Sequence, residues 1–183
     1  KQIRQPYVLY VQEDYFLTAP VNRAQLAQDF AEAMAAGAAA LCFRARSEPD
    51  PGFQSLNDRF GIVPLDSDGR TRCQVTLWKK SALQAILRPG ETAWNFEARG
   101  SARTPEMQIH SYGRRENTPI PYLMSAISRG YWMPEAIALC RAHEVTIDPF
   151  CRPVYSPRSW QRNLRRMLSW RPAVQKGGVI DLS

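Results

Sequence analysis

The stretch 7-YVLYVQEDYF-16 decides the predicted fold, because it joins an apolar run to two adjacent carboxylates. Its β-branched and aromatic residues are typical of a buried strand. Glu13 and Asp14 interrupt the run near its end, and α/β proteins bind ligands beyond the carboxyl ends of their strands. The pattern therefore predicts either a site for a hard divalent cation and its phosphate oxygens, or a strand whose tip is simply solvated.

A strand–helix–strand unit follows from the next residues. Asn22 suits a helix N-cap, Gln25 completes a capping box, and Gly37 suits the stop after the last turn. Residues 39–43 read as another buried strand. Such a βαβ crossover predicts parallel neighbouring strands, and hence an α/β fold.

The rest of the first 155 residues alternates between loops and short elements. Residues 47–72 are rich in proline, glycine and aspartate, which predicts a long loop that acts as a lid or a specificity element. We expect strands over residues 60–63, 73–78, 107–112, 120–124 and 145–147, and helices before Pro89, over residues 92–98 and from Pro134 to about His143.

Two blocks carry a resemblance to a known family. The acidic stretch resembles the DxD-type metal segment of GT-A glycosyltransferases, and 89-PGETAWNFEARGS-101 resembles their G-E-x-x-W-x-F-E-x-x-G-S pattern. The similarity runs from about Pro6 to Pro153 and is strongest to bacterial enzymes of surface-polysaccharide and lipopolysaccharide synthesis. It implies a GT-A-like mixed sheet with flanking helices.

The resemblance also implies roles for the acidic residues. Glu13 and Asp14 would hold Mn²⁺ or Mg²⁺ on the diphosphate of a nucleotide-sugar donor. An inverting reaction needs a general base, for which Glu97 and Glu91 are the candidates. The Gly-Glu pair favours Glu91, whereas a helix face shared with Trp94 favours Glu97, which we choose.

Further residues are expected to bind substrate. Trp94 would stack on a glycan or lipid-linked acceptor, and Arg99 and Arg103 would meet a phosphate of the acceptor or the donor. Tyr15 and Trp132 are expected to contribute to the substrate-binding surface. The alternative for the second block is a core tryptophan beside a surface glutamate.

The chain departs from the family at its start. Strands and helices that bind the nucleotide precede the acidic segment in GT-A enzymes, whereas five residues precede Pro6 here. We therefore expect the C-terminal metal- and acceptor-binding part of a longer protein, lacking much of the N-terminal nucleotide-binding half. Residues 1–155 would form this domain, and residues 156–183 a basic amphipathic helix and tail.

Composition limits the partners and the location. The net charge of +7 predicts an anionic partner or a generic solubility charge, and the predicted helix over residues 156–170 fits an anionic membrane surface, a docked helix or an oligomer contact. Nucleic acid is an unfavoured partner, because no recognition motif accompanies the arginines. Scattered cysteines and the absence of a secretory signal predict a cytoplasmic protein, and the basic helix over residues 156–170 predicts a position peripheral to the inner membrane.

Two functions remain open from the sequence. The first is a metal-dependent glycosyltransferase of bacterial cell-surface polysaccharide synthesis. The second is a non-catalytic module that binds a glycan or a membrane, because a fold does not by itself determine a function.

Overall fold

A six-stranded mixed sheet is the central element of the computed structural model, which describes residues 3–43, 51–148 and 151–157. The strands of this sheet are β1 (Tyr7–Tyr10), β3 (Ala38–Cys42), β4 (Gln54–Ser55), β5 (Phe60–Ile62), β6 (Thr76–Lys79) and β7 (Gln108–Tyr112). Their order across the sheet is β1-β6-β3-β7-β5-β4. The chain is therefore of the mixed α/β class, as predicted.

Four helices and two small strand pairs complete the described elements. The helices are α1 (Arg23–Ala35), α2 (Lys80–Ile86), α3 (Ala93–Gly100) and α4 (Pro134–Ala142), with short 3-10 turns at Ser101–Arg103 and Arg115–Asn117. Strand β2 (Phe16–Leu17) pairs with β8 (Tyr122–Leu123), and β9 (Ile127–Ser128) pairs with β10 (Tyr131–Trp132).

The first strand differs from its prediction. Strand β1 ends at Tyr10 and lies at an edge of the sheet, so the expected buried strand that delivers Glu13 and Asp14 at its end is wrong. Leu9 in this strand and Val11 just after it are 47% and 48% exposed, so the apolar run is not buried as a whole. The chain then turns at Glu13 and Asp14 before it enters β2.

The two strands of the predicted βαβ unit are parallel, as expected, but they are not neighbours in the sheet. Strand β6 lies between β1 and β3 and is antiparallel to both: Thr76 pairs with Tyr10 on one side and with Cys42 on the other. Two strands antiparallel to a common neighbour run the same way, so β1 and β3 are parallel without touching. The parallel neighbour of β3 is β7.

Helix α1 forms as its caps predict. The Gln25 backbone N–H donates to Asn22 Oδ1 over 3.2 Å, so Asn22 is the N-cap as predicted. The predicted capping box is not formed, because the Asn22 backbone N–H donates to the Pro119 carbonyl over 2.9 Å instead of to Gln25. Gly37 follows the helix with φ of +82°, a backbone conformation that glycine adopts without a steric penalty.

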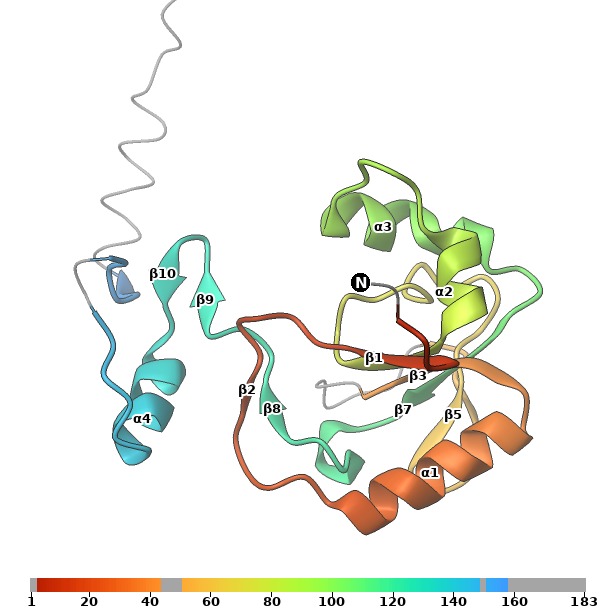
Figure 1. Cartoon of the computed structure of the whole chain (residues 1–183), viewed down its shortest axis with the longest axis horizontal. Coiled ribbons are helices and arrows are strands. Elements are labelled where there is room, and N and C mark those ends of the chain that lie inside the picture. Colours follow the sequence, from red (N-terminus) through yellow and green to blue (C-terminus); the bar gives the residue numbers. More distant parts are fainter. Residues whose placement is uncertain (1–2, 44–50, 149–150, 158–183) are drawn as a thin grey trace, which may run out of the picture. The chain divides into compact units, whose positions relative to one another are not determined.

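The helices cover both faces of the sheet (Figure 1). Helix α1 contributes Ala33 to a core that includes Leu41, Phe43 and Tyr112. Helices α2 and α3 lie on the other face, where Ile86 and Phe96 belong to a second cluster of buried side chains. Burial of these apolar side chains on both faces is the main stabilising contribution to the sheet.

Helix α3 approaches the segment before β6 more closely than a side chain would allow. A Cβ on Gly100 would lie 2.3 Å from Thr71 Oγ1, so glycine is needed here for contact. The φ of Gly100 is −67°, and the chain continues from α3 into a 3-10 turn. Its role is therefore packing rather than termination.

A buried arginine fixes the end of the predicted lid. Arg70 is 2% exposed, and its guanidinium donates to Thr104 Oγ1 over 2.8 Å and to the carbonyl oxygens of Val63, Pro64, Thr104 and Met107. No carboxylate is among these partners, and burial lowers the pKa of Arg70. This end of the residue 47–72 segment thus belongs to the core.

A second buried polar group lies on α1. Asp29 is fully buried, where it accepts hydrogen bonds from the Tyr112 hydroxyl and, over 2.7 Å, from Arg59 Nε. Burial first, and then the bond to Asp29, raises the pKa of Tyr112. The pair satisfies a carboxylate that would otherwise be costly in the core.

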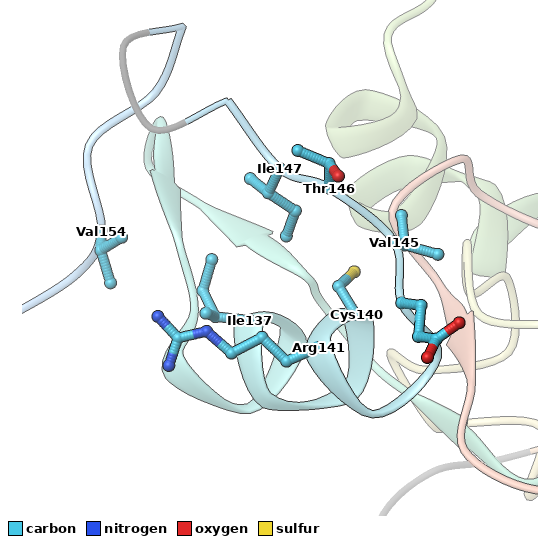
Figure 2. A pocket seen from close by; sticks show the side chains of 8 residues that line it. Ile137, Cys140, Arg141, Val145, Thr146, Ile147 and Val154 are labelled. Atoms are coloured by element: carbon cyan, nitrogen blue, oxygen red, sulfur yellow. The ribbon is translucent and has the colours of Figure 1, made fainter.

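The contacts divide the chain into two units, Lys1–Ala126 and Ile127–Ser183. In the second unit, α4 begins at Pro134 as predicted, but residues 145–147 are not a strand. They pass beside α4 and enclose an apolar groove of about 400 Å³, which Ile137, Ile147 and Val154 line (Figure 2).

The predictions for the C-terminus are not addressed by this architecture. The expected helix over residues 156–170 and the tail fall almost wholly outside the described residues, so the boundary at residue 155 stays a prediction. Within the described ranges, no helix is both long and apolar enough to cross a membrane.

Replacing the buried arginine should destabilise the chain strongly. Arg70→Met leaves several buried carbonyl groups without a donor, so we expect the free energy of unfolding to fall by about 3 kcal/mol or more. The matched change Arg114→Met, at a side chain 60% exposed, should alter it by about 0.5 kcal/mol or less. Urea denaturation measures both, and equal effects would contradict the assigned role of Arg70.

A buried histidine should make stability depend on pH. His110 is fully buried on β7 against Phe60, and burial lowers its pKa below the ordinary 6.5. The unfolded chain then binds more protons below about pH 6.5, so stability is complete above that pH and falls as the pH decreases. Urea midpoints at about pH 7.5 and about pH 5.5 should therefore differ less in His110→Phe than in the exposed control His143→Phe. A pH response that His110→Phe leaves unchanged would exclude this assignment.

Candidate functional site

The candidate catalytic residues lie along the edge of the sheet that is formed by the carboxyl ends of β1, β3 and β7. Tyr10, Thr76, Cys42 and Ser111 form one row across four strands, at the carboxyl ends of β1, β3 and β7. Because β6 runs the opposite way, the residues just before Thr76 lie beyond the same edge as the residues just after Tyr10. This is the edge at which α/β proteins bind ligands.

Glu97 is held at this edge by the chain that enters β6. Helix α3 begins at its N-cap Thr92, whose side chain accepts a hydrogen bond from the Asn95 backbone N–H over 3.2 Å. One turn later, Glu97 Oε1 accepts a hydrogen bond from the Cys73 backbone N–H over 2.6 Å. The carboxylate is half-buried, so its position is set by a charge-assisted bond rather than by solvent.

Tyr15 lies where the two acidic segments converge. Its ring stacks on Tyr122 at 5.2 Å between centroids, and burial raises the pKa of its hydroxyl. The negative charges of Asp14 and then Glu97 raise that pKa further. Both carboxylates therefore act on the same hydroxyl, although they are far apart in sequence. We call Glu13, Asp14, Tyr15, Cys73 and Glu97 the acidic edge.

The turn that carries Asp14 is fixed by hydrogen bonds. Ser125 Oγ donates to Asp14 Oδ2 over 3.0 Å, and the Ala126 backbone N–H donates to the Asp14 carbonyl over 2.8 Å. The Tyr15 N–H closes the turn onto the Gln12 carbonyl over 3.1 Å. Glu13 is exposed at its tip.

The acidic edge offers fewer carboxylates than a metal site made of protein ligands alone needs. In residues 3–43, 51–148 and 151–157, no group of three or more His, Cys, Asp or Glu side chains is placed to hold a metal ion. Mg²⁺ in nucleotide-binding proteins commonly uses one or two carboxylates, with phosphates and water as the other ligands. Glu13 and Asp14 meet that lower requirement.

Glu91 has a different environment from Glu97. Its carboxylate forms a two-point ion pair with Arg103, in which Arg103 Nη1 lies 2.8 Å from Glu91 Oε2. Arg103 Nη1 also donates to the Ile86 carbonyl over 2.6 Å. The bond to Arg103 is the main cause of a lowered pKa of Glu91. A carboxylate stabilised in its charged form is a poor proton acceptor, so this environment does not suit Glu91 to the role of a base.

The remaining predicted residues are dispersed. Trp94 is 81% exposed on α3, and Arg99 is also exposed, while Glu97 of the same helix turns toward Cys73. Trp132 lies on β10 of the second unit. Asp14 and Tyr15 thus share one turn, the charge of Glu97 acts on the Tyr15 hydroxyl, and Trp94 is exposed to solvent.

A cavity opens beside the acidic edge, between α2 and α3. Its volume is about 300 Å³, and apolar side chains dominate its walls. Cys73 links it to Glu97, because its backbone binds that carboxylate while its side chain lines the cavity. Burial, and secondarily the charge of Glu97, raises the pKa of the Cys73 thiol to about 11. The lining residues are Tyr10, Arg72, Cys73, Trp78, Leu83, Leu87, Arg88, Glu91, Thr92, Ala93 and Phe96.

Sequence reasoning missed two residues that position the site. Cys73 acts through its backbone N–H, and Ser125 binds Asp14 from a segment more than a hundred positions away. Neither belongs to a motif, and the pairing of β6 with β1 and of β8 with β2 brings them to this edge. No family model, curated protein sequence or solved structure matches the chain.

Proposed function

We propose that the chain is the metal- and acceptor-binding part of a glycosyltransferase that uses a nucleotide-sugar donor. The observation that carries the proposal is the hydrogen bond from the Cys73 backbone N–H to Glu97, which holds that carboxylate beyond the carboxyl end of β1, where the turn with Glu13 and Asp14 follows. The acceptor would be a glycan or lipid-linked sugar of bacterial cell-surface polysaccharide synthesis, as the two sequence blocks suggest. Transfer needs one acidic centre at the leaving diphosphate and one base at the acceptor.

The acidic edge divides these tasks between its carboxylates. Glu13 and Asp14 are the residues that would hold a divalent cation, which when bound neutralises charge on the leaving diphosphate. Glu97 takes the proton of the acceptor hydroxyl while that oxygen attacks the anomeric carbon. The bond from the anomeric carbon to the phosphate oxygen breaks, and the diphosphate leaves with the electron pair.

The positions of the carboxylates support this division. Glu97 Oε1 is bound by the Cys73 N–H, so in this scheme its second oxygen receives the proton. The hydrogen bond from Ser125 keeps Asp14 in its turn. A base needs a defined geometry before it needs a tuned pKa, and the backbone of the segment entering β6 provides it.

The alternative of a non-catalytic glycan- or membrane-binding module is favoured by one observation, the 81% exposure of Trp94. An exposed tryptophan suits a binding surface without chemistry. The two functions differ in whether a cation and a nucleotide diphosphate bind together.

Removing one charge from the adjacent carboxylates Glu13 and Asp14 should abolish the joint binding of cation and nucleotide. In thermal-shift titrations we expect Mn²⁺ with a nucleoside diphosphate to stabilise the unchanged chain more than either alone, and Asp14→Asn to lose that gain. The amide introduced by Asp14→Asn keeps an oxygen for Ser125, so the unliganded melting temperature should hold. Asp66→Asn, a carboxylate exposed in the loop before Arg70, is the control. Absence of joint stabilisation in the unchanged chain would favour the binding module.

Separate substitutions at the two glutamates should distinguish base from ion pair. Glu97→Gln keeps an oxygen for the Cys73 N–H but cannot accept the proton, so turnover should fall by about 10²–10⁴-fold with an unchanged melting temperature. Glu91→Gln weakens the pair with Arg103 and should lower the melting temperature while turnover per folded molecule persists. Transfer assays of the complete enzyme measure both. The reverse pattern would assign the base to Glu91.

A further inference from the structure

The cavity between α2 and α3 combines an apolar interior with a basic mouth. Trp78 and Phe96 are buried at its base, while Leu83 and Leu87 form the α2 side. Its volume of about 300 Å³ is at the lower end of the range for small-molecule sites, which are mostly apolar with a few polar groups. An apolar portion of a ligand fits this interior by burial of its surface.

The charges at the mouth favour an anion. Arg72 and Arg88 line the cavity together with Glu91, the only acidic residue among its lining residues. Arg103 already pairs with Glu91, so the Arg88 guanidinium is the positive group of the lining that an anion can meet. Arg88 is exposed and donates through Nη1 to the Ala85 and Leu87 carbonyls at the end of α2, so its position is defined. Guanidinium groups in such positions are well suited to phosphate.

Exposed apolar side chains lie next to the opening. Leu87 lines the cavity and is 49% exposed, and Trp94 follows the lining residue Ala93 on α3 with 81% exposure. Aromatic and aliphatic groups exposed beside arginines are typical of surfaces that meet amphiphiles. The mouth therefore offers contacts to both parts of a ligand with an apolar chain and an anionic head.

We propose that this cavity binds the lipid part of the acceptor, as an apolar chain that carries a phosphate. The inference rests on the proposed transferase function and adds the substrate class. Cys73 lines the cavity and binds Glu97 through its backbone N–H. A lipid chain held in the cavity would therefore place its phosphate-linked sugar beside Glu97. Leu87 contacts the apolar chain of the ligand, and Arg88 binds the phosphate of the ligand.

Binding of octyl phosphate below its micelle concentration tests the proposal on the full chain. We expect saturable binding of octyl phosphate by calorimetry, with octanol at least about tenfold weaker and inorganic phosphate weaker still. Leu87→Glu should weaken the binding of octyl phosphate by about tenfold or more, and Arg88→Gln should weaken it by about fivefold. Leu65→Glu, at a leucine 68% exposed outside the cavity, and Arg114→Gln are the matched controls and should bind as the unchanged chain does.

Each outcome separates this inference from the transferase proposal. Equal binding of octyl phosphate and inorganic phosphate, or equal losses in Leu87→Glu and Leu65→Glu, would overturn the cavity assignment. Octanol binding as tightly as octyl phosphate would overturn the role of Arg88. Glu97→Gln should keep octyl phosphate affinity. If octyl phosphate fails to bind while Mn²⁺ and a nucleoside diphosphate still stabilise the chain, the lipid inference is wrong and the transferase proposal stands.

Discussion

The hydrogen bond from the Cys73 backbone N–H to Glu97 is the interaction on which the site depends. It fixes a carboxylate of α3 to the chain entering the strand that separates β1 from β3, and so places Glu97 at the edge where the acidic turn lies. Two contacts hold this segment in place, the packing of Gly100 against Thr71 and the buried hydrogen bonds of Arg70. Contacts of the buried core thereby position the half-buried carboxylate of Glu97.

Local sequence signals predicted local structure well. The N-cap at Asn22, the stop at Gly37 and the start of α4 at Pro134 all appear where expected, because each depends on neighbours within one helical turn. The buried strand at residues 39–43 also forms, since a continuous apolar run needs two covered faces.

Long-range structure was beyond these signals. Nothing near β1 indicates that β6 inserts beside it, and that insertion makes β1 an edge strand and separates it from β3. The arginine at residue 70 resembled any loop arginine, because its partners are carbonyl groups brought together by the fold. Likewise Glu91 and Glu97 look equivalent in sequence, and their different partners, Arg103 and the Cys73 backbone, distinguish them.

Paramagnetic broadening by Mn²⁺ gives the most direct test of the acidic edge as one site. Amide signals of the ¹⁵N-labelled chain should be recorded with a nucleoside diphosphate while Mn²⁺ is added in small steps. If Glu13 and Asp14 lie close to Glu97 of α3, the signals of Asp14, Tyr15, Cys73 and Glu97 should broaden first and together. Broadening confined to residues 66–69, or spread evenly over the exposed carboxylates, would contradict it.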